Sequence, residues 1–160
     1  MERTPGATAR AIALVSALLL GAGCAERTEV RLAQAFDGAT AALREGQVAR
    51  AIALADEALP PGGEANSPNA WTLKLLRAEA EIARLRAEDA RAAVRAVLPP
   101  GPGFTPLRAR QKYLQARMSV LAGALEPALD LLDQATTMAP ADATLRLDVE
   151  VLGGQIRLRL

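Results

Sequence analysis

The side chains that perform most enzyme chemistry are rare in this chain of 160 residues, which has no histidine and one cysteine, Cys24. Zinc sites, Ser-His and Cys-His catalytic pairs and haem ligation through histidine need donors that the chain lacks. A disulfide within the chain is excluded too, because it needs a second cysteine.

Carboxylates are the remaining candidates for acid–base chemistry, and they occur in short groups. These are Asp56-Glu57, Glu79 with Glu81, Glu88-Asp89, and Asp130 with Asp133. Such groups are typical of solvated helix faces, and Glu88-Asp89 stands at a predicted helix start, where the helix dipole favours negative charge. No glycine-rich phosphate loop follows a strand, because no strand is expected. The sequence predicts a protein that is not an enzyme and uses no metal or cofactor.

Four arginines could form part of a basic face that binds an acidic partner: Arg84, Arg86, Arg91 and Arg95. The carboxylates between them instead favour pairing with neighbours along the same helix. The formal net charge of the chain is only +1, which gives no electrostatic footprint for nucleic acid. We expect neither nucleic acid nor a small-molecule substrate as the partner.

The first 23 residues have the pattern of an export signal. Arg3 and Arg10 precede an apolar run over residues 11–20, and small residues follow up to Cys24. A charged start, a short apolar stretch and small residues before a cleavage point are typical of a secretory signal peptide. The run is too short to span a bilayer, which takes about 20 apolar residues. We therefore predict a signal peptide over 1–23.

Cys24 directly follows Leu-Gly-Ala-Gly, and this stretch resembles the lipobox of bacterial lipoproteins, except that Gly21 stands where the family has an aliphatic residue. The resemblance implies cleavage before Cys24 and lipidation of its thiol. Two or more acyl chains would hold the protein stably on a membrane, facing the periplasm or the cell exterior. The alternatives are cleavage without lipidation, which gives a soluble periplasmic or secreted protein, and an uncleaved anchor or a buried cysteine.

The rest of the chain has the composition and spacing of helices. Alanine and leucine make up more than a third of the residues and aromatics only 2%, which favours helices over β-sandwiches or barrels. Apolar residues recur at helical intervals between Pro/Gly-rich stretches. We predict an all-α fold with helices over 29–45, 48–59, 68–85, 87–98, 106–122, 126–138 and 142–160. Ser67, Thr105 and Asp142 are the expected N-caps.

The first six predicted helices form three consecutive pairs, and these pairs share a sequence pattern. In the third pair, the residues at characteristic offsets are Gly123, Ala128, Leu132, Ala135 and Pro140. The same offsets hold Gly46, Ala51, Ala55 and Ala58 in the first pair, and Leu85, Ala90, Val94 and Val97 in the second; Ala39, Ala78 and Ala116 match in the first helices. This pattern resembles the tetratricopeptide repeat, with periods of 39 and 38 residues instead of the usual 34.

The resemblance implies an α-solenoid over 29–160, with about three helix pairs and an unpaired last helix, joined to the signal peptide by a short tether over 24–28. A plain helical bundle or another α-solenoid remains the alternative. Small residues would let paired helices approach closely, and each pair would bury its apolar face against the next. The predicted core comprises Leu32, Phe36, Ile52, Leu59, Trp71, Leu75, Ile82, Val94, Tyr113, Leu121, Leu131 and Leu132.

In the resembling family, the first helix of each pair lines a concave face that binds peptides or proteins. The register nominates Phe36, Thr40, Arg44, Thr72, Glu79, Arg110, Tyr113 and Arg117 for such contacts. Several of these residues could belong to the core instead, and the aromatic residues Phe36 and Tyr113 are more often packing residues. The resulting expectation is a lipid-anchored scaffold that holds a protein or peptide partner in the bacterial cell envelope.

The last predicted helix supports an alternative to the lipid-anchored scaffold. It is apolar on more than one side, and one further period would place the next turn near residue 161 or 162. The chain could therefore be the N-terminal repeat segment of a longer multidomain protein, such as one that continues into a caspase-like peptidase domain. Catalysis would then lie outside this chain.

Overall fold

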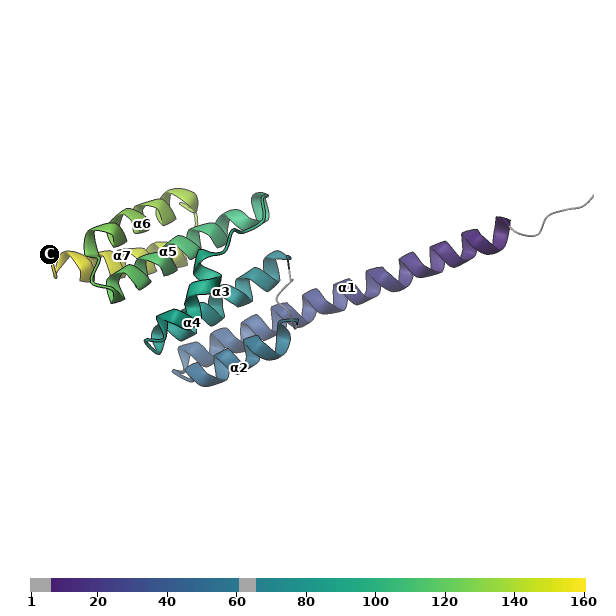
Figure 1. The fold of residues 1–160 in the computed structure, drawn as a ribbon, viewed down its shortest axis with the longest axis horizontal. Helices are drawn as coiled ribbons and strands as arrows, with labels where there is room; N and C mark the ends of the chain where they lie inside the picture. Colours follow the sequence, from purple (N-terminus) through teal and green to yellow (C-terminus); the bar gives the residue numbers. More distant parts are fainter. Residues whose placement is uncertain (1–6, 61–65) are drawn as a thin grey trace, which may run out of the picture.

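The computed structural model describes residues 7–60 and 66–160, and within them the side chains from Glu26 onward (Figure 1). The described residues form helices and no strand, which confirms the all-α prediction. The helices are α1 (Ala7–Arg44), α2 (Val48–Ala58), α3 (Pro68–Ala83), α4 (Ala87–Arg95), α5 (Thr105–Leu121), α6 (Leu125–Met138) and α7 (Ala143–Arg157), with a short 3-10 helix, η1 (Pro102–Phe104), before α5.

The first helix begins earlier than the sequence indicated. We predicted its start near residue 29, but α1 begins at Ala7 and continues without a break through residues 24–28. This stretch contains no proline, and Ala, Glu and Arg propagate a helix readily. The predicted signal peptide falls partly on residues 1–6, outside the described residues, and the side chain of Cys24 is also outside them. None of the described helices is long and apolar enough to cross a membrane.

Two of the three predicted N-caps are confirmed. The Ser67 hydroxyl accepts a hydrogen bond from the Ala70 N–H at 3.2 Å, and the Asp142 carboxylate accepts one from the Leu145 N–H at 2.9 Å. Thr105 is not a cap, because α5 follows η1 directly and already includes it. The reason is Phe104, which is buried with Trp71 and Leu98 and so folds the Pro/Gly-rich connection back onto the helices.

Each helix pair turns in the same way. The turn residues Gly46, Leu85 and Gly123 all have a left-handed backbone, with φ of 73°, 62° and 77°. In each turn, the N–H of this residue donates to the carbonyl three residues back at 3.0 Å, and the next N–H donates to the carbonyl five residues before it at 2.8–2.9 Å. These two hydrogen bonds define a Schellman motif. The local geometry therefore repeats at intervals of 39 and 38 residues.

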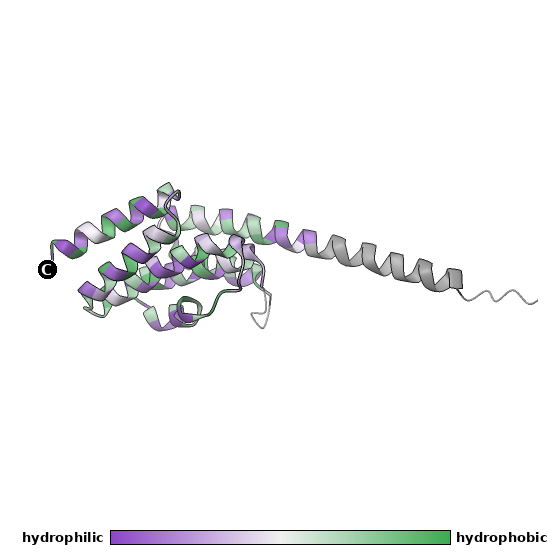
Figure 2. Ribbon diagram, turned by 90° about the horizontal axis from the view of Figure 1, so that it is seen from above, coloured by the Kyte–Doolittle hydropathy of each residue, from purple (hydrophilic) through white to green (hydrophobic). Residues whose placement is uncertain are grey.

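The helices pack in a regular order. Helices α1, α3, α5 and α7 form a row in which each member contacts the next (Figure 1). Helices α2, α4 and α6 each pack against the two neighbouring members of that row. Hydrophilic and hydrophobic residues alternate along the helices of this assembly (Figure 2), as expected for helices that bury one face.

Small residues allow this close packing. Ala39, Ala78 and Ala116, at the matched positions of α1, α3 and α5, are at most 1% exposed. Val97, by contrast, is 93% exposed, because α4 already ends at Arg95 and leaves it outside the helix.

The predicted core is largely confirmed, with one clear error. Leu121, which we placed in the core, is 46% exposed because it is the last residue of α5 and lies beside the turn at Gly123. Phe36, Leu59 and Leu131 are half-buried. The other predicted core residues are buried: Leu32, Ile52, Trp71, Leu75, Ile82, Val94, Tyr113 and Leu132.

Candidate binding groove

The row of helices α1, α3, α5 and α7 creates a hollow of about 290 Å³, which we call the groove. It is lined by Phe36, Thr40 and Arg44 of α1, Thr72, Leu75, Leu76 and Glu79 of α3, Pro106, Leu107 and Arg110 of α5, and Asp142, Thr144 and Leu145 at the start of α7. Apolar side chains from all four helices therefore mix with threonines and with charges of both signs. Such a composition suits recognition of a peptide, which offers apolar side chains and polar backbone together.

Most of the residues that the sequence nominated for partner binding meet in this groove. Those that line it are Phe36, Thr40, Arg44, Thr72, Glu79 and Arg110. They converge because residues four apart share one helix face, and because the row places equivalent faces side by side. Tyr113 and Arg117 lie further along α5 and do not line the groove, but both contact its charged residues.

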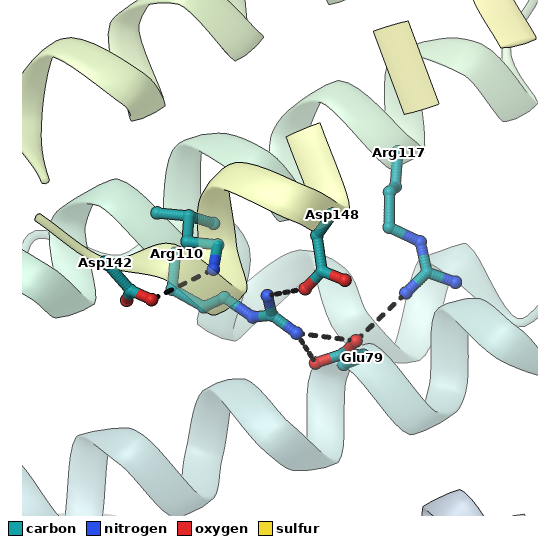
Figure 3. Close-up of polar contacts among 6 residues, drawn as sticks. Glu79, Arg110, Arg117, Asp142 and Asp148 are labelled. Atoms are coloured by element: carbon teal, nitrogen blue, oxygen red, sulfur yellow. Dashed lines mark hydrogen bonds and ion pairs between the residues drawn. The ribbon is translucent and has the colours of Figure 1, made fainter. Parts of the chain in front are cut away.

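A network of four charged side chains joins α3, α5 and α7 (Figure 3). Arg110 Nη2 donates to both carboxylate oxygens of Glu79, at 2.8 and 2.7 Å, and Arg110 Nη1 donates to Asp148 Oδ2 at 2.5 Å. Arg117 Nη1 donates to Glu79 Oε1 at 3.3 Å. Glu79 thus accepts from two arginines, which fixes the three helices relative to one another.

Partial burial strengthens this network. The side chains of Arg110 and Glu79 are 27% and 20% exposed. Burial by itself disfavours the charge on Arg110, but attraction to Glu79, together with the hydrogen bonds to Asp148 and Glu79, outweighs it and raises the pKa of Arg110. The ion pairs therefore favour the charged form of Arg110 despite its burial.

Tyr113 has a packing role. Its side chain belongs to the core cluster that joins α3 to α7, and it is only 8% exposed. The guanidinium groups of Arg110 and Arg117 lie over its ring, with Cζ 4.8 and 6.0 Å from the ring centroid. Burial raises the pKa of the Tyr113 hydroxyl. The ring therefore supports the two arginines from below and is not itself presented to a partner.

Two groove residues have unused hydrogen-bonding capacity. Arg44 is exposed and makes no ion pair with the residues that the structure describes. The Thr40 hydroxyl, one turn earlier on α1, is buried and has no hydrogen-bond partner there either. A buried polar group without a partner is costly in a folded protein. Arg44 on the α1 wall can therefore gain hydrogen bonds from a bound chain, whereas the Thr40 hydroxyl is covered and Glu79 and Arg110 are already paired.

The sequence reasoning missed several groove residues. The apolar groove side chains of Leu76, Leu107 and Leu145 were not nominated, nor was Asp148, which does not line the groove but pairs with Arg110. A signal for Asp148 was present, because it lies 38 residues after Arg110, as Arg110 lies 38 after Thr72. Applying the period of the turns once more would have found it.

Comparison of the chain with protein-family models, curated protein sequences and solved structures gives no match. Among the described side chains, those of residues 26–60 and 66–160, no group of three or more carboxylates could hold a metal ion. The interpretation of the groove therefore depends on its own geometry: four helices, an apolar lining, and an arginine on one wall whose charge is not paired.

Proposed function

We propose that this protein binds a peptide or a segment of a partner protein in the groove and serves as a scaffold. The observation that carries this proposal is the convergence of side chains from α1, α3, α5 and α7 on one hollow, with apolar residues between charged ones. Arg44 would pair with an acidic group of the partner, and the Thr72 hydroxyl, which already donates to the Pro68 carbonyl, would accept from a backbone N–H of the partner. The Glu79–Arg110–Asp148 network would keep the opposite wall rigid, so that little ordering accompanies binding.

We further propose that the helix pairs are repeats of the tetratricopeptide type, stacked as an α-solenoid. Three features support this. The left-handed turns recur at 39 and 38 residues, alanines at matched positions are buried in α1, α3 and α5, and each helix pair packs against the next. In such an arrangement stability comes from contacts between neighbouring repeats.

The proposed location is the bacterial cell envelope, with the protein exported and anchored to a membrane through acylated Cys24. The support is the sequence of residues 1–24, which combines basic residues, an apolar run and small residues before the cysteine. Figure 1 shows that α1 projects well beyond the other helices on its N-terminal side. Phe36 follows Cys24 by 12 residues, or about 18 Å of helix, so the groove would stand clear of the membrane surface.

Site-specific photo-crosslinking in the native cell tests the binding proposal. Thr72, in the groove, is replaced by p-benzoylphenylalanine, and Asp133, an exposed residue of α6 outside the groove, carries the same replacement as the matched control. We expect a discrete adduct from position 72 that is absent from position 133 and weakened by Arg44→Glu. No adduct from position 72, or the same adducts from both positions, would contradict the proposal.

Mass spectrometry of the purified N-terminus tests the anchor separately. We expect a mature chain that begins with acylated Cys24, and we expect the Cys24→Ser variant to lose the acyl mass. An unprocessed Met1, an unmodified Cys24 or cleavage elsewhere would overturn the anchor without affecting the groove.

A second candidate function follows from the exposed apolar face of α7. Leu147, Val151 and Leu158 are 61%, 54% and 90% exposed, and their spacing places them on one side of the helix. A further helix pair would cover this face if the chain were the N-terminal repeat segment of a longer protein, such as one with a caspase-like peptidase domain. Reading the gene past the codon for Leu160 tests this: an in-frame continuation with a turn near residue 162 supports it, and an immediate stop codon rules it out.

A further inference from the structure

The turn between α3 and α4 contains a leucine where its two counterparts contain glycine. Leu85 has φ of 62°, in the left-handed region, as do Gly46 and Gly123. A side chain disfavours this conformation because its Cβ crowds the following carbonyl oxygen, and glycine is the residue that avoids this cost. The sequence therefore keeps a strained residue at a position where it uses glycine in the other two turns.

Packing within the fold does not account for this leucine. Leu85 is 76% exposed, so its side chain contributes little to the core. Leu121, which is 46% exposed, lines the same two hollows as Leu85, one on each side of the turn. Strained residues that the fold does not require are concentrated at functional sites. The two leucines thus mark an apolar rim that is available to another molecule.

The larger of these hollows, of about 730 Å³, is a trough between α4 and α6. Its floor is one face of α5, formed by Gln115, Met118, Ser119 and Ala122, which recur at helical intervals. One wall is α4, with Glu88, Arg91, Val94 and Arg95; Leu131 of α6 stands on the other side, and Leu85 and Leu121 form the rim. Two helices that flank the exposed face of a third create the shape in which a further helix can lie.

The charges that line the trough determine which kind of helix could bind in it. Glu88 is already paired with Arg91, whose Nη2 lies 2.5 Å from its carboxylate. Arg95, one turn further along the same wall, makes no ion pair with the described residues. The wall therefore has a positive charge that pairs with no described residue, next to a floor in which Met118 and Ala122 alternate with Gln115 and Ser119.

We propose that the trough binds an amphipathic, acidic helix of a partner protein. Its apolar stripe would lie against Met118, Leu85 and Leu121, and a carboxylate on its polar face would pair with Arg95. A basic helix would meet Arg91 and Arg95 with like charge and would be disfavoured. This site is distinct from the groove, since residues 106–110 line the groove, residues 115–122 line the trough, and the two share no residue.

The test measures peptide binding by fluorescence anisotropy with the full chain. The probe is a fluorescein-labelled helical peptide of leucine, alanine and glutamate, about 18 residues long, with leucines at i, i+3, i+4 and i+7. A companion peptide has every glutamate replaced by lysine. We expect the acidic peptide to bind about ten-fold more tightly than its companion, and Arg95→Glu to reverse this preference.

The Leu85→Gly variant distinguishes a loss of peptide binding from a loss of folding. Because it removes the left-handed strain, we expect the melting temperature to rise by a few degrees, while the affinity for the acidic peptide falls about five-fold with the loss of the apolar contact. A variant that is more stable but binds less cannot be explained by misfolding. Leu147→Ala, at an exposed leucine of α7 outside the trough, is the matched control and should leave the affinity unchanged.

Three outcomes would overturn the proposal: no binding of the acidic peptide, equal binding of both peptides, or an affinity that Leu85→Gly does not change. Sedimentation with phosphatidylglycerol vesicles tests whether the rim binds a membrane instead of a helix. Co-sedimentation that Leu85→Gly abolishes, without peptide binding, would assign the rim to lipid instead. Thr72→Trp, which fills the groove, should leave peptide binding intact, so failure of the groove proposal and of this one can be told apart.

Discussion

The groove and the trough are two hollows beside the same helix, α5, but they differ in how their side chains are satisfied. In the groove, Glu79 and Arg110 are paired with each other and with charges on neighbouring helices. In the trough, Leu85 is exposed and strained, and Arg95 makes no ion pair within the described part of the chain. The comparison shows that polar residues of the groove also hold the fold together, whereas the rim of the trough contributes little to it. Substitutions in the two places should therefore have opposite effects on stability.

The largest effect is expected at the centre of the groove network. Glu79→Ala leaves Arg110 paired with Asp148 alone, and it leaves Arg117 without an ion pair among the described residues. We expect the free energy of unfolding to fall by about 2–3 kcal/mol, somewhat less than for a fully buried pair, because these side chains are one fifth to one quarter exposed. Urea denaturation followed by circular dichroism measures it.

The matched control for Glu79 is Glu88, which pairs with Arg91 on the wall of the trough but has a side chain 77% exposed. Because exposed ion pairs contribute little, Glu88→Ala should change the free energy of unfolding by less than about 0.5 kcal/mol. Equal losses from the two variants would remove the distinction between the hollows.

The next largest effects on the free energy of unfolding are expected at two of the turns, and these effects have opposite signs. Gly123→Ala places a Cβ in a left-handed conformation, and no atom lies within 4 Å of that position, so the cost is conformational alone. We expect it to lower the free energy of unfolding by about 1 kcal/mol and Leu85→Gly to raise it by a similar amount. Chemical denaturation of both variants gives the two values. A loss of stability in Leu85→Gly would mean that the leucine serves the fold after all.

The N-cap of α7, at one end of the groove, allows a further comparison of two variants by their stability. Asp142→Ala removes the acceptor for the Leu145 N–H and should cost about 1 kcal/mol. Thr105→Ala should cost almost nothing, since Thr105 lies inside α5 and caps no N–H. Thermal melts of the two variants, recorded side by side, check the difference. If both lose the same stability, the capping assignment is wrong.

The smallest effect concerns Tyr113, the only tyrosine of the chain, beneath the groove network. Because burial raises its pKa, tyrosinate absorbance at 295 nm should appear at a higher pH than the usual midpoint of about 10. The stability that this shift contributes is complete below the pKa of the unfolded chain and is lost as the pH rises through the folded value. A midpoint at or below the ordinary value would place the ring in solvent.

Much of the fold could be predicted from local signals. The ends of α2, α3 and α6 agree with the sequence within about two residues, because capping residues and Pro/Gly-rich connections define them locally. The register of the first helices also brought Phe36, Thr40 and Glu79 together correctly, since a helical face is a local property.

The errors in the predicted fold arise where contacts between residues far apart in the sequence determine the structure. Leu121 lies outside the core because α5 ends there, and the helix predicted over 87–98 already ends at Arg95 and leaves Val97 exposed; the apolar pattern alone does not fix either end. Phe104 folds the preceding connection onto Trp71, and no local signal indicates this contact. The trough was not foreseen for the same reason: it depends on how α4 and α6 pack against α5.

The most direct measurement of the central claim is photo-crosslinking from three positions of the full chain in its own cell. The positions are Thr72 in the groove, Ser119 on the floor of the trough and Asp133 in neither. We predict an adduct from Thr72, a different adduct from Ser119 and none from Asp133. If Thr72 gives no adduct, or gives the same adducts as Asp133, the groove is not a binding site and the account of this protein as a scaffold fails.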